Sequence, residues 1–306
     1  MAEATATKAP KKHLFVPGHT ACAGCGQAIA AMFVVDTAGP NTIIANNTGC
    51  LEVLSSRFPE TAWEVPWIHS LFENASAVAS GIEAALKFLG KKEGINVIAQ
   101  GGDGSTADIG LQALSGMFDR GHDILYVCYD NEAYMNTGVQ RSGLTPFDTS
   151  TTTSPSGKQS FGNPLPKKNM VGIAAAHRIP YSASASVGYP QDIKNKVKKA
   201  LAKRGPKYLQ IHVPCPLGWR HDPSQTMNVA RLAVETGLYP LVEYENGELV
   251  NVRKIAEIKP VTEYLKTQAR FRHLLAPEAA EQVKLIQAIA DENIRRLGLR
   301  REEKKA

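Results

Sequence analysis

Cysteines are the first residues of this 306-residue sequence whose type and spacing suggest chemistry. Cys22 and Cys25 form a Cys-x-x-Cys pair, and Cys50, Cys128 and Cys215 stand alone. An odd number of cysteines in a chain expected in a reducing compartment argues against a disulfide framework. Cys128 lies in an apolar segment that reads as a buried strand, so we interpret it as a core residue. The other four cysteines are the candidates for metal or redox chemistry.

Four thiolates can bind either Zn²⁺ or an iron–sulfur cluster. Zinc ribbons normally carry two Cys-x-x-Cys pairs close together, whereas Cys50 and Cys215 are single and far apart, so zinc is disfavoured. A thioredoxin-like redox pair at Cys22 and Cys25 is the other alternative, but it leaves Cys50 and Cys215 without a role. Pro216 follows Cys215, as proline often follows a cluster cysteine.

The segment Gly102–Gly104, with the sequence Gly-Asp-Gly, is a second candidate for chemistry. Glycines let the backbone approach an anion, and the helix expected soon afterwards favours negative charge at its start. Asp103 offers a hard oxygen ligand for Mg²⁺, and Asn131 and the backbone carbonyl of Ala133 offer two more after the next strand. Mg²⁺ completes its octahedron with phosphates and water, so a diphosphate bridged by Mg²⁺ fits. Alone, Gly-Asp-Gly is a weak signal that also describes a turn with a capping Asp.

The elements that must position these residues alternate between buried strands and helices. This alternation predicts an α/β fold with a mainly parallel sheet and flanking helices. Ligands in such open sheets bind beyond the carboxyl ends of the strands, where four candidate ligands fall, so we expect one crevice to collect them. The predicted strands are Asn41–Ala45, Ile95–Ala99, Ile124–Tyr129 and Tyr208–Val213, followed respectively by Cys50, Asp103, Asn131 and Cys215. The predicted helices are Glu73–Leu89, Ala107–Phe118 and Gln191–Ala202.

The sheet pattern fades after about Met227, so we predict a cofactor-binding domain over 1–226 and a C-terminal extension over 227–306. The extension is expected to contain a hairpin at Glu243–Asn251 and an amphipathic helix at Pro277–Leu297, and to contact another subunit. Residues 138–169 are rich in Ser, Thr, Pro and Gly. So long a loop inside a compact domain is usually functional or covered by a partner.

Composition narrows the class of protein. The chain is 43% hydrophobic with a formal net charge of +6, much of it in Lys and Arg near the two ends, which we interpret as solvated tails. No basic face with base-reading groups is evident, so nucleic-acid binding is not expected. No apolar run reaches the roughly 18 residues of a membrane span, and the N-terminus has no secretory signal pattern. We therefore expect a cytoplasmic protein that does not bind membranes.

Five motifs in this order resemble the β subunit of the pyruvate:ferredoxin oxidoreductase (2-oxoacid:ferredoxin oxidoreductase) family. The resemblance runs from about Phe15 to Tyr244, and one departure is Asp130-Asn131 in place of the usual Asn-Asn pair. The motifs are Gly18–Gly26, Asn47–Cys50, Gly102–Gly104, Asn131–Gly138 and Pro214–Pro216.

This resemblance implies the diphosphate-binding domain of thiamine-diphosphate enzymes, with thiamine diphosphate, Mg²⁺ and one [4Fe–4S] cluster as cofactors. The resemblance implies that Mg²⁺ is held by Asp103, Asn131 and the Ala133 carbonyl, and that Asn136 lies beside the substrate. The implied cluster ligands are Cys22, Cys25, Cys50 and Cys215. The implied cofactor-binding residues are Gly49, Cys50, Gly102, Asp103, Gly104, Ser105, Asn131, Ala133, Asn136 and Thr137. His19, Glu52 and His69 are equally interpretable as contacts or as structural hydrogen-bond partners.

The resemblance also implies a reaction and a set of partners. Pyruvate, CoA and oxidised ferredoxin would give acetyl-CoA, CO₂ and reduced ferredoxin, with oxalate, phenylglyoxylate or branched-chain 2-oxoacids as alternative substrates. The expected partners are an α subunit with the pyrimidine-binding domain, a γ subunit, a ferredoxin-like δ subunit and ferredoxin. Without the α subunit the chain is expected to be inactive. The alternatives outside the family are a thiamine decarboxylase or synthase without a cluster, and a zinc-binding interaction protein that is not an enzyme.

Overall fold

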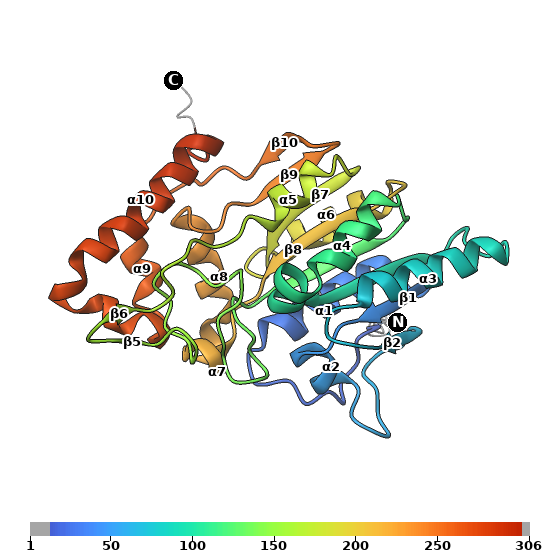
Figure 1. Cartoon of the computed structure of the whole chain (residues 1–306), viewed down its shortest axis with the longest axis horizontal. Helices are drawn as coiled ribbons and strands as arrows, with labels where there is room; N and C mark the ends of the chain where they lie inside the picture. The colour runs from blue at the N-terminus through green and yellow to red at the C-terminus, as the bar shows by residue number, and fades with distance from the viewer. Residues whose placement is uncertain (1–12, 302–306) are drawn as a thin grey trace, which may run out of the picture.

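The computed structural model describes residues 13–301, and its central feature is an eight-stranded sheet (Figure 1). The strand order is β10-β9-β7-β8-β4-β3-β1-β2. The strands from β7 to β2 pair in parallel, and β9 and β10 add an antiparallel hairpin at one edge. The prediction of an α/β fold with a mainly parallel sheet is confirmed. The strands are β1 (Thr42–Asn46), β2 (Trp67–His69), β3 (Asn96–Gly102), β4 (Leu125–Asp130), β7 (Tyr181–Ser186), β8 (Lys207–His212), β9 (Val242–Glu245) and β10 (Glu248–Val252).

The four predicted strands correspond to β1, β3, β4 and β8, and the largest difference is at β3, which continues to Gly102. β7 was not predicted, because its sequence Tyr-Ser-Ala-Ser-Ala-Ser lacks the β-branched residues that mark strands. Its serines are nevertheless buried, because each hydroxyl donates to a backbone carbonyl. Ser182 donates to Val171 at 2.9 Å and Ser184 to Pro240 at 2.7 Å. Burial of these hydroxyls therefore leaves no unpaired polar group.

Helices cover both faces of the sheet. One layer contains α1 (Gly26–Ala38), α6 (Pro190–Leu201) and α8 (Thr226–Glu235), and the other contains α3 (Ala75–Phe88), α4 (Leu111–Asp119) and α5 (Met170–Ala176). The predicted helices correspond to α3, α4 and α6. A π-helix, η1 (Ser105–Ile109), precedes α4, and the short elements are α2 (Cys50–Ser55), α7 (Pro216–Trp219), η2 (Pro223–Gln225), β5 (Ser156–Gly157) and β6 (Ser160–Phe161). Two-sided cover explains why every residue of β4 and β8 is buried.

The C-terminal part forms its own hydrophobic core beside the sheet, in addition to the cores on the two faces of the sheet (Figure 1). The hairpin around Asn246–Gly247 is confirmed, and both turn residues have positive φ, as tight hairpin turns require. β9 pairs with β7, so this hairpin extends the main sheet. The predicted amphipathic helix is also present and begins slightly later than expected. The remaining elements are α9 (Val261–Leu265), η3 (Ala269–Leu275), η4 (Pro277–Ala279) and α10 (Ala280–Leu297).

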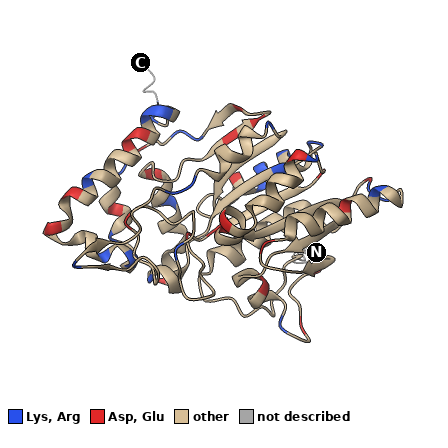
Figure 2. Cartoon of the chain, viewed as in Figure 1, with Lys and Arg blue, Asp and Glu red and all other residues tan. Residues whose placement is uncertain are grey.

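Residues 138–169 contain no helix and run as a long loop, apart from the β5–β6 pair. Both basic and acidic residues are distributed along α10 (Figure 2). Over residues 13–301, no helix is both long enough and apolar enough to cross a membrane.

Candidate active site

A pocket at the carboxyl ends of β1, β3 and β4 brings the predicted cofactor-binding residues together. The predicted residues that line it are Gly49, Cys50, Gly102, Asp103, Gly104, Ser105, Asn131, Ala133, Asn136 and Thr137. The other lining residues are Gln27, Thr48, Phe72, Tyr134 and Met135. Tyr134 and Met135 lie inside the Asn131–Gly138 motif, so their position beside the pocket could have been predicted from the sequence. Gln27 and Phe72 come from α1 and from the loop before α3, and no sequence signal marked them.

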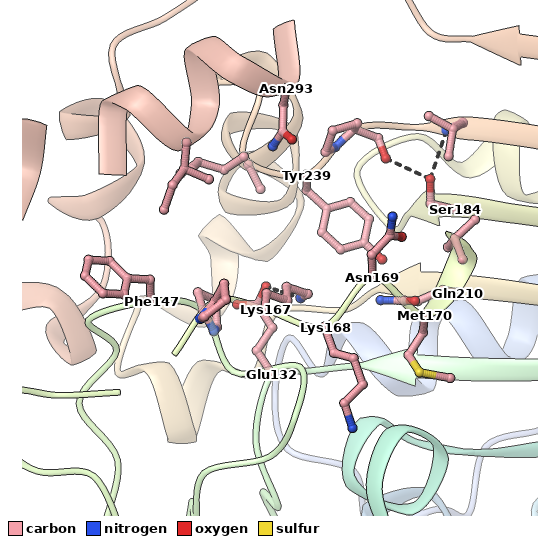
Figure 3. Close-up of a pocket in the computed structure, with 18 of the residues that line it drawn as sticks. Glu132, Phe147, Lys167, Lys168, Asn169, Met170, Ser184, Gln210, Tyr239 and Asn293 are labelled. Atoms are coloured by element: carbon pink, nitrogen blue, oxygen red, sulfur yellow. Dashed lines mark hydrogen bonds and ion pairs between the residues drawn. The ribbon is translucent and has the colours of Figure 1, made fainter. Parts of the chain in front are cut away.

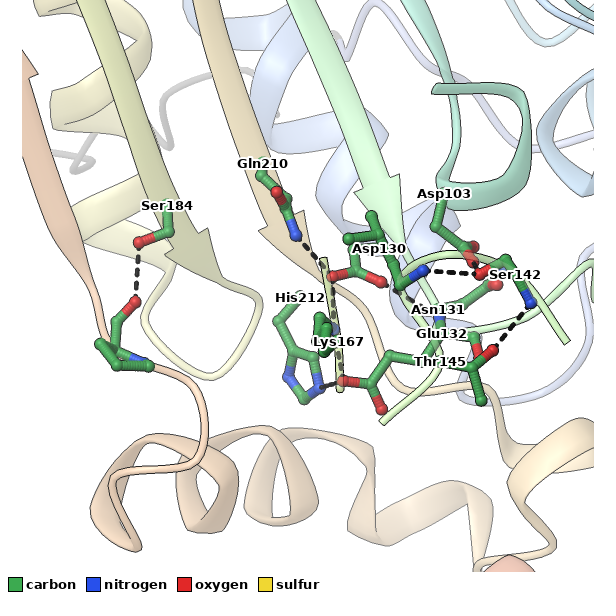
Figure 4. Close-up of polar contacts among 12 residues, drawn as sticks. Asp103, Asp130, Asn131, Glu132, Ser142, Thr145, Lys167, Ser184, Gln210 and His212 are labelled. Carbon is green, nitrogen blue, oxygen red and sulfur yellow. Dashed lines mark hydrogen bonds and ion pairs between the residues drawn. The ribbon is translucent and has the colours of Figure 1, made fainter. Parts of the chain in front are cut away.

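Asp103 and Asn131 lie side by side at the ends of β3 and β4 (Figure 4). One terminal atom of the Asn131 amide is 2.9 Å from Asp103 Oδ1 and 2.9 Å from the carbonyl oxygen of Ala133. With nitrogen at this position the amide donates to both oxygens, and with oxygen at this position the amide oxygen lies 2.9 Å from each of the other two oxygens. Adjacent ligand oxygens around an octahedral Mg²⁺ lie about 2.9 Å apart, given Mg–O distances near 2.0–2.1 Å. The two separations from Asn131 therefore fit two edges of a Mg²⁺ octahedron.

The Asp103 carboxylate is buried, with 1% of its surface exposed, and no cation pairs with it among residues 13–301. The Ser142 hydroxyl donates a hydrogen bond to its second oxygen, Oδ2. Burial, together with the nearby charge of Asp130, raises the pKa of Asp103 well above its usual value. A carboxylate in this position needs a cation to remain ionised.

Gly104 packs against the ring of Tyr134. A Cβ at position 104 would lie 2.5 Å from the nearest ring carbon, so only glycine fits without displacing that ring. Tyr134 is held in place from its other end, because its hydroxyl donates to Asp108 Oδ2 at 3.0 Å. The close approach keeps the Gly-Asp-Gly backbone at the pocket wall.

Three of the four candidate cluster cysteines lie at helix N-termini. Cys25 is the N-cap of α1, Cys215 is the N-cap of α7, and Cys50 is the first residue of α2. The Cys215 sulfur accepts a hydrogen bond from the Gly218 N–H at 3.3 Å. Helix N-termini and backbone N–H groups stabilise thiolates.

The fold brings four cysteines from distant parts of the chain into one region, namely Cys22, Cys25, Cys50 and Cys215. Burial raises the pKa of Cys50 to about 12, and the charges of Cys215, Cys25 and Cys22 contribute to the shift. Burial also raises the pKa of Cys215 to about 11, with contributions from Cys25 and Cys22. Over residues 13–301, no three His, Cys, Asp or Glu side chains form a metal site as they stand, so the ligand role of the cysteines stays a prediction. Cys128 is fully buried in β4.

Asn136 lies between the two groups of candidate ligands. It lines the pocket that contains Asp103, and its side chain hydrogen-bonds to Cys50, which lowers the pKa of that thiol and partly opposes the effect of burial. Its neighbour Thr137 donates to Gln140 Oε1 at 2.7 Å. Asn136 is thus placed to contact both a cofactor in the pocket and the cysteine region.

His19, Glu52 and His69 are not among the pocket-lining residues of the described chain. His19 stacks on Phe15 with ring centroids 5.1 Å apart, and His69 Nε2 is 2.7 Å from the Thr48 hydroxyl. These contacts favour the structural interpretation for the two histidines. Glu52 lies on α2 directly after Cys50 and Leu51.

A larger cavity of about 300 Å³ lies between the sheet and α10 (Figure 3). Its walls are mainly apolar and include Phe147, Tyr239 and Phe271. Glu132 and Lys167 also line it, so this cavity approaches the Asp130–Ala133 turn from the side opposite the pocket. The predicted cofactor-binding residues do not line this cavity.

Comparisons with known proteins identify relatives of this chain. The family "Thiamine pyrophosphate enzyme, C-terminal TPP binding domain" matches residues 47–211. A pyruvate synthase subunit PorB of Methanosarcina barkeri is 61% identical over 292 residues, covering 95% of this chain and 98% of the relative. A ketoisovalerate oxidoreductase subunit VorB of Pyrococcus abyssi is 48% identical over 273 residues, covering 87% of both chains.

A solved 2-oxoglutarate:ferredoxin oxidoreductase from Magnetococcus marinus shares the fold, with a TM-score of 0.57 and 22% identity over 96% of this chain and 91% of that chain. The matched thiamine-binding segment spans the strand ends that carry Cys50, Asp103 and Asn131. Site geometry and high-identity relatives agree: the chain belongs to the family of pyruvate:ferredoxin oxidoreductase β subunits and contains a thiamine-diphosphate-binding domain.

Proposed function

We propose that this chain is the β subunit of an enzyme that converts pyruvate, CoA and oxidised ferredoxin to acetyl-CoA, CO₂ and reduced ferredoxin. The observation that carries the proposal is one pocket in which Asp103, Asn131 and Ala133 face each other, next to the cysteine region. Asn136 joins the two. Most of the closely similar relatives carry the name pyruvate synthase.

Mg²⁺ would be held by Asp103 Oδ1, the Asn131 side-chain oxygen and the Ala133 carbonyl. Two findings support this assignment: the 2.9 Å spacing of these groups, and the burial of Asp103 without a cationic partner. The diphosphate of the cofactor would supply further oxygens to the ion. Gly102 leaves open space beside the backbone where that diphosphate would approach, because a Cβ there would meet nothing within 4 Å.

A [4Fe–4S] cluster would be held by Cys22, Cys25, Cys50 and Cys215. The helix N-termini at three of these cysteines provide N–H groups for the negative charge that thiolates bring to a cluster. The side-chain amide of Asn136 would then donate to the Cys50 sulfur on the side facing the pocket. This contact would also hold the Asn136 side chain in place for the substrate.

When bound, thiamine diphosphate supplies an electron sink for the loss of CO₂, and the cluster supplies a one-electron acceptor. The residues of this chain orient the diphosphate through Mg²⁺ and hold the cluster next to the cofactor. The α subunit, with its pyrimidine-binding domain, would supply the carboxylate that activates thiamine, so we expect no turnover by this chain alone. A γ subunit and a ferredoxin-like δ subunit complete the proposed complex, which we assign to the cytoplasm because free cysteines persist in a reducing compartment.

A branched-chain 2-oxoacid is the second candidate substrate. A ketoisovalerate oxidoreductase subunit is 48% identical to this chain, so β subunits of this kind serve more than one 2-oxoacid enzyme. Comparing kcat/KM for pyruvate and for 2-oxoisovalerate in the purified complex decides between them. Pyruvate should be preferred at least tenfold.

The proposal is tested on the complex purified with its partner subunits under strict anaerobiosis, by counting thiamine, iron and sulfide per chain. Cys215→Ala should remove about four iron atoms per chain and abolish ferredoxin reduction. Cys128→Ala is the matched control, because this cysteine is buried in β4 and should leave the iron count unchanged. Zinc in place of iron, with no thiamine, would contradict the proposal.

A further inference from the structure

The turn from Asp130 to Ala133 has an unusual residue at its centre. Glu132 separates Asn131 from Ala133, and its backbone adopts φ 66°, a left-handed conformation that few non-glycine residues occupy. Asn131 and Ala133 line the cofactor pocket, whereas Glu132 lines the larger cavity on the other side. The left-handed residue therefore lets both of its neighbours face the same pocket, and something must hold it there.

Two cations hold the Glu132 side chain. Lys167 Nζ lies 2.6 Å from Oε1, and Arg270 Nη2 lies 2.6 Å from Oε2. Glu132 and Arg270 are buried, Lys167 is partly buried, and Figure 4 shows Lys167 between Glu132 and Asp130. The backbone is held as well, because the Thr145 hydroxyl donates to the Glu132 carbonyl at 2.7 Å.

Lys167 cannot hold Glu132 alone, because it also pairs with Asp130 Oδ2 at 2.7 Å. Arg270 supplies the second positive charge that two buried carboxylates require. Arg270 belongs to η3 in the C-terminal part of the chain, 138 residues away from Glu132 in sequence. The conformation of the turn thus depends on a residue outside the region that the thiamine-enzyme family covers.

Arg270 also reaches the cysteine region through Trp219. Its guanidinium lies 3.5 Å from the centroid of the Trp219 ring, and Trp219 Nε1 donates to the Asn131 carbonyl at 2.9 Å. Trp219 is the last residue of α7, the helix capped by Cys215. The Arg270 side chain thereby contacts Glu132, in the turn that contains Asn131, and Trp219, in the helix that Cys215 caps.

We propose that Arg270 is a positioning residue for both cofactor sites, holding the Asn131–Ala133 turn through Glu132 and the Cys215 helix through Trp219. The inference rests on the proposed function and adds a role for the C-terminal extension in cofactor retention. Without Arg270, Lys167 would be shared between two buried carboxylates, and the left-handed turn would relax. Asn131 and Ala133 would then lose the spacing that fits Mg²⁺.

The test uses the purified complex, depleted of thiamine diphosphate and Mg²⁺ and then titrated with both. Arg270→Met should raise the dissociation constant of thiamine diphosphate at saturating Mg²⁺ at least tenfold. Arg270→Lys keeps the charge but loses the planar group that stacks on Trp219, so it should bind thiamine diphosphate more tightly than Arg270→Met. It should nevertheless shift the electron paramagnetic resonance signal of the reduced cluster. Arg295→Met, which removes an exposed ion pair with Glu292 on α10, is the control for loss of an arginine.

A double variant separates positioning from general damage. Adding Glu132→Gln to Arg270→Met removes one of the two buried carboxylates that would share Lys167, so it should restore folding but not the tight binding of thiamine diphosphate. Binding within twofold of wild type in Arg270→Met and Arg270→Lys, with an unchanged cluster signal, would overturn the inference. Failure of the wild-type complex to bind thiamine diphosphate in a Mg²⁺-dependent way would instead reject the proposed function. If Arg270→Met does not assemble, the cluster signal and affinity of Arg270→Lys still decide.

Discussion

Asp103 is a buried carboxylate at the end of β3 whose nearest polar partners are uncharged side chains and its own turn. A charge in this position lowers the stability of the cofactor-free chain and becomes favourable only beside a cation. The proposed role as a Mg²⁺ ligand and the stability of the cofactor-free chain therefore make opposite demands on this residue. Such a conflict is typical of functional sites.

Asp103→Asn should consequently abolish Mg²⁺-dependent binding of thiamine diphosphate while leaving the cofactor-free complex at least as stable. We expect the dissociation constant to rise by two orders of magnitude or more and the midpoint of thermal unfolding to stay equal or rise. Calorimetry with and without cofactor measures both. Asp119→Asn, at the exposed end of α4, controls for loss of a carboxylate. A lower unfolding midpoint without cofactor would show that Asp103 has a structural role.

Asp148 is a second buried carboxylate, in the long loop, and its Oδ2 has no hydrogen-bond partner in the described chain. Burial raises its pKa to about 6 in the folded chain, above the unfolded value near 3.9. The folded state therefore binds this proton more tightly, and its stability falls as the pH rises through about 6. The loss is complete above that pH and is absent well below the unfolded pKa.

Asp148→Asn should raise the free energy of unfolding by roughly 1–3 kcal/mol at pH 7.5, and by clearly less at pH 5. Asparagine also accepts the left-handed backbone at this position, where φ is 58°. Chemical denaturation of both proteins at the two pH values measures the difference. An equal effect at both pH values would mean that ionisation of Asp148 is not the cause.

At the scale of elements, α1 and the segment after β8 meet closely enough to bring Cys25 and Cys215 into one region. The Gly26 N–H donates to the Pro214 carbonyl at 3.3 Å, and a Cβ on Gly26 would lie 2.8 Å from that oxygen. Each residue of this contact is adjacent to one of the two cysteines. The glycine therefore sets the separation between two of the candidate cluster ligands.

Gly26→Ala should push these segments apart and lower the cluster content of the complex by half or more. Gly81→Ala is the matched control, because a Cβ there meets nothing within 4 Å in the middle of α3, where alanine favours the helix. Iron analysis and the visible absorption of the cluster provide the readout. Full iron content in Gly26→Ala would contradict the importance of this contact.

Over the whole molecule, several large apolar side chains near the cofactor pocket are exposed. Leu71 precedes the pocket residue Phe72 and is 60% exposed, and Leu217 follows Cys215 by two positions and is 70% exposed. Contiguous exposed apolar surface beside a site is typical of a surface that a partner covers. This placement agrees with the proposal that another subunit completes the active site.

Leu71→Asp and Leu217→Asp should each reduce recovery of the assembled complex several-fold, because a carboxylate would be buried without a partner. Phe88→Asp is the control: Phe88 is 90% exposed at the end of α3 that projects from the body in Figure 1. Size-exclusion chromatography with subunit quantification gives the result. Assembly unaffected in both leucine variants would place the partner elsewhere.

Sequence patterns were sufficient to predict the parallel α/β sheet, the positions of β1, β3, β4 and β8, and the residues that follow them. These features depend on short segments of sequence. An uninterrupted apolar run indicates a strand that is buried on both faces. A Cys, Asp or Asn that follows it is expected at the carboxyl end of the sheet, where ligands bind. The Asn246–Gly247 turn and α10 were local signals of the same kind. β7 and α1 were missed because their small or uniformly apolar residues carry no distinct period.

The residues that support those at the strand ends could not be predicted from sequence, because long-range packing brings them there. Gln27 and Phe72 reach the pocket because of how α1 and the loop before α3 pack, and Arg270 reaches Glu132 across 138 residues. A buried ion pair leaves no periodic trace in sequence, since either partner alone resembles an ordinary surface charge. Its existence depends on long-range packing, which brings the C-terminal core against the sheet.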